Sequence, residues 1–215
     1  MIDGSEFESR FDSGSLAKAE ENHTIFSNEK SRAFNLWVTE DNPNNVGEHD
    51  SVKPTSSGWF YFAVKKMKGC PKVEFNILNM CMNKTLFKNG KDNGLRPVWN
   101  QNFDPAMQKH DMDEWLPVNT CEVSKGKNDN FVLTFTHQFR GTEFNTTYFA
   151  LYEPFTYHKH LKRLEYFEQK MTLSADILYH KELLCYSKEN RRVDMLTITH
   201  PVNVPNRNNL LHAIR

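Results

Sequence analysis

The stretch Phe7-Glu8-Ser9-Arg10-Phe11-Asp12-Ser13-Gly14-Ser15-Leu16 occurs once in this sequence of 215 residues. Segments later in the chain form one ordered set of motifs together with this stretch. A second informative feature is an absence. None of the nine histidines has a glutamate three residues later. That H-x-x-E spacing would bring an imidazole and a carboxylate to one metal ion, so the sequence shows no metal site of this kind.

The composition indicates a folded protein with a substantial core. Aromatic residues make up 13% of the chain and sixteen of them are phenylalanine. Lysine and arginine total 27, as do aspartate and glutamate. Balanced charge and many aromatics are not typical of disorder. The same balance removes the general electrostatic argument for nucleic acid or an anionic membrane as a partner.

The cysteines and the apolar segments point to a reduced compartment. Cys70, Cys81, Cys121 and Cys185 form no C-x-x-C pair, so neither a zinc ribbon nor a small disulfide scaffold is expected. We interpret them as small buried apolar residues. No apolar run approaches the ~20 residues that span a bilayer, and the N-terminus does not resemble a signal peptide. We therefore expect a cytoplasmic protein.

Short apolar runs dominate the chain up to Pro154. They are Ala33–Val38, Trp59–Val64, Val73–Leu78, Phe131–Thr136 and Tyr148–Tyr152. Alternation within them has the period of two that indicates half-buried strands. We predict a mostly β protein, with an antiparallel β-sandwich domain over residues 7–153. Residues 1–6 are expected to be a disordered or appended N-terminus, and Glu40–Ser57 a mobile surface insertion.

The periodicity changes after Pro154. Apolar residues from Tyr157 to Met171 recur at helical spacing, and Thr156 can cap the helix. The opposite face carries His158, Lys159, Lys162 and Arg163. Glu182–Tyr186 and Val193–Thr199 then predict a β-hairpin. We assign 154–199 to this helix and its strands, and 200–215 to a linker or tail.

Each set of residues that could form a metal, catalytic or binding site also has an ordinary structural explanation. His110 and Asp113 have metal-ligand spacing but lie in a polar segment, and any cysteine could in principle pair with a histidine. Trp59–Phe62 beside Lys65 could form a stacking platform for nucleic acid, but a strand buried on both faces explains the same pattern. The basic helix face could meet an acidic partner, although such faces are usually solvated.

Taken together, these segments resemble the front part of a cytosolic carboxypeptidase, a zinc metallocarboxypeptidase subfamily that removes glutamates from tubulin. The family's opening pattern is Phe7–Leu16, with Ser15 in place of the usual asparagine. Its Trp-Phe-Tyr-Phe strand is Trp59–Phe62, and its Phe-Asn-Ile segment is Phe75–Asn79. Two further matches are Pro154–Tyr157 and Leu196–Thr199.

The resemblance implies a β-sandwich domain that precedes the catalytic domain. The helix and hairpin would then be the first elements of an α/β carboxypeptidase domain. The family's zinc motif would follow these elements, so no catalytic or metal-binding residue can be transferred to this chain, and the chain by itself is expected to be inactive. Zinc is expected only in the catalytic domain of the parent enzyme. The sequence leaves open whether the parent is active.

The expected role is noncatalytic: packing or folding with the catalytic domain in cis, and shaping substrate access. Tubulin or other glutamate-rich proteins are the implied partners, with a cytoplasmic, microtubule-associated location. The candidates for holding the sandwich and its interdomain contact are Phe7, Arg10, Phe11, Asp12, Trp59, Tyr61, Tyr152 and Tyr157. For any single one of them, a role as an ordinary core or turn residue is the more common explanation.

Two alternatives remain open from the sequence. One is a free-standing β-sandwich that binds a protein partner and has no enzymatic parent. The other is an independent hydrolase with a Cys-His or His-Asp site.

Overall fold

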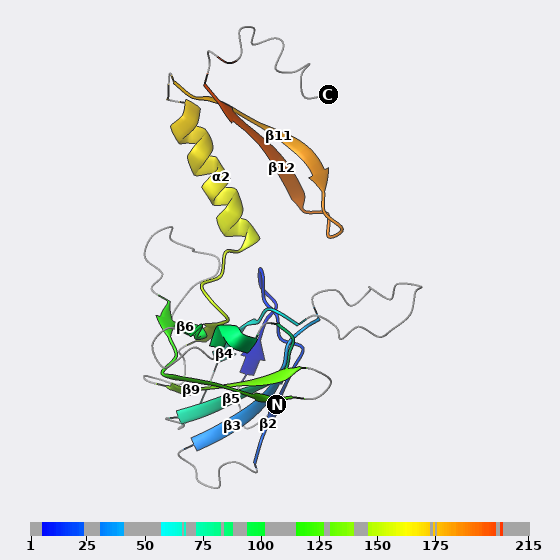
Figure 1. The fold of residues 1–215 in the computed structure, drawn as a ribbon, viewed down its shortest axis with the longest axis vertical. Helices are drawn as coiled ribbons and strands as arrows, with labels where there is room; N and C mark the ends of the chain where they lie inside the picture. Colours follow the sequence, from blue (N-terminus) through cyan, green and yellow to red (C-terminus); the bar gives the residue numbers. More distant parts are fainter. Residues whose placement is uncertain are drawn as a thin grey trace, which may run out of the picture. The chain divides into compact units, whose positions relative to one another are not determined.

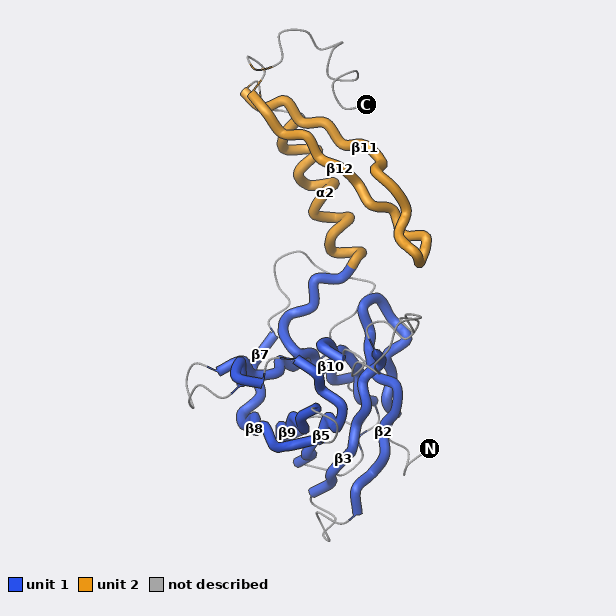
Figure 2. Tube along the Cα trace, turned by 45° about the vertical axis from the view of Figure 1, so that its right-hand side comes forward, with its two compact units in different colours: residues 1–156 blue, residues 157–215 orange. Residues whose placement is uncertain are grey.

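The computed structural model describes residues 6–23, 31–40, 57–65, 67, 72–82, 84–87, 94–101, 115–126, 130–139, 146–172, 174, 176–200 and 203. The chain divides into two compact units, residues 1–156 and 157–215 (Figure 2). The insertion expected at Glu40–Ser57 falls almost wholly outside the described residues, as do His110 and Asp113. The same holds for residues 1–5 and most of the tail expected at 200–215.

The first unit contains two five-stranded sheets (Figure 1). In spatial order, the first sheet is β1 (Glu6–Glu8), β4 (Tyr61–Lys65), β10 (Thr147–Ala150), β6 (Val98–Gln101) and β7 (Leu116–Pro117). The second is β2 (Lys18–Glu21), β3 (Ser31–Trp37), β5 (Lys72–Met80), β9 (Phe131–Gln138) and β8 (Thr120–Lys125). A 3-10 turn, η1 (Lys84–Phe87), follows β5.

The expected mostly β sandwich is confirmed, with one difference in strand direction. All pairs are antiparallel except β3 and β5, which run parallel with Phe34 opposite Phe75. Between these two strands in sequence, β4 lies in the other sheet. The chain therefore leaves the second sheet and returns to it in the same direction, which a tight hairpin cannot achieve.

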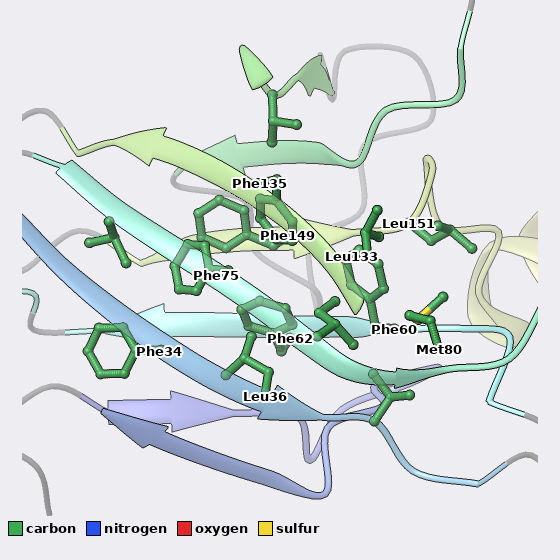
Figure 3. Packing of buried hydrophobic residues seen from close by; sticks show 14 of the residues in the cluster. Phe34, Leu36, Phe60, Phe62, Phe75, Met80, Leu133, Phe135, Phe149 and Leu151 are labelled. Carbon is green, nitrogen blue, oxygen red and sulfur yellow. The ribbon is translucent and has the colours of Figure 1, made fainter. Parts of the chain in front are cut away.

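The core lies between the sheets and is rich in phenylalanine (Figure 3). Phe62 and Phe149 of the first sheet and Phe75 and Phe135 of the second are fully buried. The centroids of the Phe75 and Phe149 rings are 5.0 Å apart. Burial of an aromatic side chain stabilises by about 1.5–3 kcal/mol, so this cluster dominates the stability of the unit.

The N-terminal boundary requires a correction. We expected Glu6 in a disordered segment, but it is the first residue of β1 and lies opposite Lys65. The ammonium of Lys65 also pairs with the carboxylate of Glu8. Glu6 therefore belongs to the first sheet and not to the preceding segment.

The second unit contains α2 (Tyr157–Thr172), β11 (Leu178–Tyr186) and β12 (Arg192–Thr199). The helix begins directly after the buried Thr156, as the capping position predicts. The two strands form an antiparallel hairpin whose turn includes Asn190 at a φ of 57°. Within the described residues, no helix is long and apolar enough to cross a membrane.

Candidate functional site

Alternate residues of β4 and β10 point away from the sandwich core. Tyr61 and Ala63 of β4, with Tyr148 and Ala150 of β10, form a second buried cluster on the outer face of the first sheet. This explains why β4 has no polar face, as expected for a strand buried on both sides. The aromatic members and their neighbours, hereafter the outer aromatic cluster, are Phe11, Trp59, Tyr61, Trp115, Tyr148 and Tyr152.

The N-terminal loop covers this outer face. The ring centroid of Phe11 lies 4.7 Å from that of Tyr61 and 5.6 Å from that of Tyr148. The backbone of Ser15 pairs with that of Tyr61, with an N–H to carbonyl distance of 2.8 Å. The part of the opening stretch that follows β1 therefore forms a loop over this face, and Phe11 is its apolar contact.

A tight turn shapes the loop. Ser13 has a φ of 64°, and the amide of Gly14 donates to the carbonyl of Phe11 at 2.9 Å. A Cβ on Gly14 would lie only 2.0 Å from the carbonyl oxygen of Ser9. The indole Nε1 of Trp59 donates to the carbonyl of Ser13 at 2.7 Å. The turn therefore depends on glycine and on the indole.

The structure separates the other candidate residues. Phe7 packs in the sandwich core, with its ring centroid 5.0 Å from that of Phe34. Arg10 is exposed, and Asp12 accepts a hydrogen bond from the Ser13 hydroxyl. Tyr157 belongs to the second unit, where its hydroxyl donates to the carbonyl of Arg192 at 3.0 Å. Of the eight candidates, only Phe11, Trp59, Tyr61 and Tyr152 form one cluster.

The edge of this cluster is open to solvent. Tyr152 is 52% exposed although its ring centroid is 5.0 Å from that of Trp59, and the nearby Phe155 is 61% exposed. Trp115 and Tyr148 were not predicted as members of this cluster. Tyr148 could have been found by alternation within its strand, whereas the sequence near Trp115 carries no pattern that links it to β4.

The hairpin of the second unit also exposes large apolar side chains. Its exposed residues, hereafter the hairpin apolar surface, are Leu183, Leu184, Tyr186, Val193, Leu196 and Ile198. Leu184 and Ile198 are the most exposed of them, at 60% and 59%. Several large apolar side chains exposed on one small unit indicate an interaction surface.

Polar contacts join the hairpin to its helix. Lys181 of β11 forms an ion pair with Glu168 of α2, and this hydrogen bond raises the pKa of Lys181. Burial raises the pKa of the neighbouring Tyr179 phenol. Tyr179 and Lys181 lie on the side of β11 that faces α2. The ion pair with Glu168 holds the hairpin against the helix.

The described residues include no cluster of side chains that could hold a metal ion. In the ranges that the structure covers, no three histidine, cysteine, aspartate or glutamate side chains converge to hold a metal ion. His137 is buried among aromatic rings, 4.6 Å from Trp99 and 5.0 Å from Phe149 between ring centroids. Cys121 is half-buried, and burial raises the pKa of its thiol to about 11. The interpretation of the cysteines as buried residues needs correction, because Cys185 is exposed at the hairpin end and Cys81 and Cys121 are only partly buried.

Comparisons with known proteins show the family to which the chain belongs. The model of the family described as cytosolic carboxypeptidase N-terminal domain matches residues 7–152, which form the sandwich. The chain therefore belongs to the cytosolic carboxypeptidase N-terminal domain family.

The chain is also similar to individual proteins named as cytosolic carboxypeptidases. It is 28% identical to mouse cytosolic carboxypeptidase-like protein 5 over 218 residues, covering 90% of this chain and 23% of the relative. The human protein of that name is 29% identical with the same coverage. Mouse cytosolic carboxypeptidase 6 is 26% identical over 200 residues, covering 92% of this chain and 31% of the relative. The chain thus spans a quarter to a third of the length of these relatives.

Proposed function

We propose that this domain is a noncatalytic part of a zinc carboxypeptidase and packs against the catalytic domain in cis. The observation that supports this most directly is the hairpin apolar surface. A two-stranded hairpin is marginal in water, and further strands or a packed layer are needed to stabilise it. A catalytic domain that contacts Leu184 and Ile198 would supply that layer.

The proposal assigns the chemistry to the catalytic domain. Zinc would be held there, because the described residues of this chain do not converge on a metal ion. The resemblance to tubulin-trimming carboxypeptidases supports removal of glutamates from acidic protein tails as the parent's reaction. The location would be cytoplasmic and microtubule-associated. The sandwich would assist folding of the parent and limit access to its substrate.

The first test uses the 215-residue chain and the catalytic region of mouse cytosolic carboxypeptidase-like protein 5 as a separate chain. Isothermal titration calorimetry should detect binding. The double substitution Leu184→Ser, Ile198→Ser should weaken it about tenfold or more, because two apolar side chains leave the interface. Leu86→Ser is the matched control, since Leu86 is 46% exposed in the other unit. Equal binding of the double variant would contradict the proposal.

A second measurement separates this role from the alternatives. Zinc content and glutamate release from polyglutamylated tubulin are measured with the 215-residue chain alone, and we expect neither. Stoichiometric zinc with release would place a catalytic site in this chain. Tight tubulin binding that the catalytic region does not alter would favour a free-standing binding module.

A further inference from the structure

The strand register places two aromatic rings side by side at the open edge of the outer aromatic cluster. The amide of Leu151, directly after β10, donates to the carbonyl of Phe60, directly before β4, at 3.2 Å. Continuing the antiparallel register by one residue sets Tyr152 opposite Trp59. Because side chains alternate between the two faces of a sheet, both rings lie on the outer face that also carries Tyr61.

These two rings, Trp59 and Tyr152, are hereafter called the aromatic corner. Their centroids are 5.0 Å apart and their planes are inclined by 60°. Tyr152 is 52% exposed and Trp59 is half-buried. The corner therefore combines an inclined pair of rings with access from solvent.

The aromatic corner is held in place before any ligand binds. The indole Nε1 of Trp59 donates to the carbonyl of Ser13 at 2.7 Å, and the indole ring lies 6.4 Å from that of Tyr61 between centroids. Tyr152 directly follows Leu151, which is 1% exposed. Because groups that are already fixed lose little freedom on binding, this arrangement lowers the cost of forming a complex.

Elsewhere in the chain, partly exposed aromatic rings carry a cation. Lys18 lies 4.8 Å from the ring centroid of Trp37, and Arg191 lies 5.4 Å from that of Tyr157. Within the described part of the chain, no lysine or arginine lies over either ring of the aromatic corner. The face of an aromatic ring is the negative side of its quadrupole and attracts cations, most strongly in tryptophan. The corner is therefore complementary to a cation from another molecule.

We propose that the aromatic corner binds the guanidinium group of an arginine on a partner protein. A guanidinium is planar, stacks on aromatic faces and is more weakly hydrated than an ammonium. It therefore loses less hydration than a lysine side chain when it moves against the two rings. An anion is disfavoured, because the ring faces carry negative partial charge. The partner is thus a protein with an exposed arginine.

This inference goes beyond the proposed packing in cis and does not depend on it. The aromatic corner belongs to the first unit, whereas the hairpin apolar surface belongs to the second. The double variant Leu184→Ser, Ile198→Ser should therefore leave arginine binding unchanged. Failure of the packing proposal and failure of this one would be seen in different variants.

Nuclear magnetic resonance of the 15N-labelled 215-residue chain tests the proposal. The chain has four tryptophans, and the indole resonance of Trp59 is identified by its absence from the Trp59→Phe variant. Titration with the blocked peptide glycine-arginine-glycine should shift this resonance with a Kd of about 1–10 mM, because one side chain makes few contacts. Citrulline in place of arginine keeps the shape without the charge, and this peptide should bind at least about fivefold more weakly. The peptide with lysine should also bind more weakly.

Substitutions of the second ring test the site itself. Tyr152→Ala removes one side of the corner and should weaken arginine binding at least about fivefold. Tyr152→Phe should bind within about twofold of the native chain, because the contact uses the ring face and not the hydroxyl. Tyr186→Ala is the matched control, since Tyr186 is 57% exposed in the second unit, and it should also stay within about twofold. Circular dichroism confirms that each variant is folded.

Four results would overturn the proposal. The first is no shift of the Trp59 resonance at peptide concentrations up to about 50 mM. The second is equal binding of the arginine and citrulline peptides, which would indicate a contact without a role for charge. The third is equal binding of the arginine and lysine peptides, which would indicate general attraction of positive charge. The fourth is equal weakening by Tyr152→Ala and Tyr186→Ala.

Discussion

The indole of Trp59 is hydrogen-bonded to the backbone of Ser13, 46 residues earlier in the chain, with an Nε1 to carbonyl oxygen distance of 2.7 Å. The same indole contacts the exposed Tyr152, whose ring centroid is 5.0 Å away. Trp59 therefore links the turn of the N-terminal loop to the open edge of the outer aromatic cluster. The loop's position depends on this link and on the backbone pairing of Ser15 with Tyr61.

Replacing Trp59 with phenylalanine tests the link. The phenyl ring keeps apolar contact but cannot donate to Ser13, so the free energy of unfolding should fall by about 1 kcal/mol. Urea unfolding followed by circular dichroism measures the change. Trp37→Phe is the control, because Trp37 stacks with Lys18 on the other sheet, and it should cost less than about 0.5 kcal/mol. Equal costs would show that the hydrogen bond is not what holds the loop.

Gly14→Ala tests the turn itself. Its Cβ would meet the carbonyl oxygen of Ser9 at 2.0 Å, and that atom belongs to the backbone. We expect a loss of about 2 kcal/mol or more, since the loop must shift. Ser13→Gly, one residue earlier, should be close to neutral because glycine adopts the observed φ of 64° without strain. Differential scanning calorimetry compares the two variants. A native melting temperature for Gly14→Ala would mean that the loop is not packed as described.

The sequence predicted the long elements because their burial leaves a periodic pattern. The alternation of Val73, Phe75 and Ile77 identified β5, and the spacing after Pro154 identified α2. Strands β2 and β8 were missed because they are edge strands with charged residues, and β1, β6 and β7 because they are only two to four residues long. The parallel pairing of β3 with β5 depends on a crossover through the other sheet, which no local pattern records.

The candidate residues were predicted less well than the fold. Phe11, Trp59 and Tyr61 do meet, but Phe7 lies on the opposite face of the same sheet. A motif gives the order of residues and not the direction in which each points, and β1 was not recognised as a strand. Trp115 reaches Tyr61, with 5.8 Å between ring centroids, only through the tertiary fold.

The bidentate ion pair of Arg32 with Glu21 predicts a dependence of stability on pH. The guanidinium Nε and Nη2 lie 2.6 and 2.7 Å from the two carboxylate oxygens, and the side chains are only 11% and 12% exposed. The hydrogen bond with Arg32 lowers the pKa of Glu21 below 4.5. Because the folded pKa is the lower one, the pair's contribution is complete above about pH 4.5 and is lost as the pH falls through the folded value.

Glu21→Gln should therefore reduce the free energy of unfolding by about 2 kcal/mol at pH 7 and by less at pH 3. Urea titrations at the two pH values measure this difference. The control is Glu20→Gln in the same strand, since Glu20 and its partner Lys18 are about half exposed, and its effect should stay below about 0.5 kcal/mol. A cost for Glu21→Gln that is the same at pH 7 and pH 3 would argue against an ionic origin.

Two of the free cysteines, Cys121 and Cys185, should differ strongly in reactivity. Alkylation requires the thiolate, and burial raises the pKa of Cys121 to about 11, so only about 0.1% of it is ionised at pH 8. Cys185 is exposed at the end of the hairpin. In native protein treated with iodoacetamide at pH 8, peptide mass spectrometry should find Cys185 modified at least about tenfold faster than Cys121.

In urea the alkylation rates of the two cysteines should converge, because unfolding removes the burial of Cys121. Comparable rates in the native protein would mean that the inner face of β8 is open to solvent, and the packing of Cys121 against the core would then be wrong.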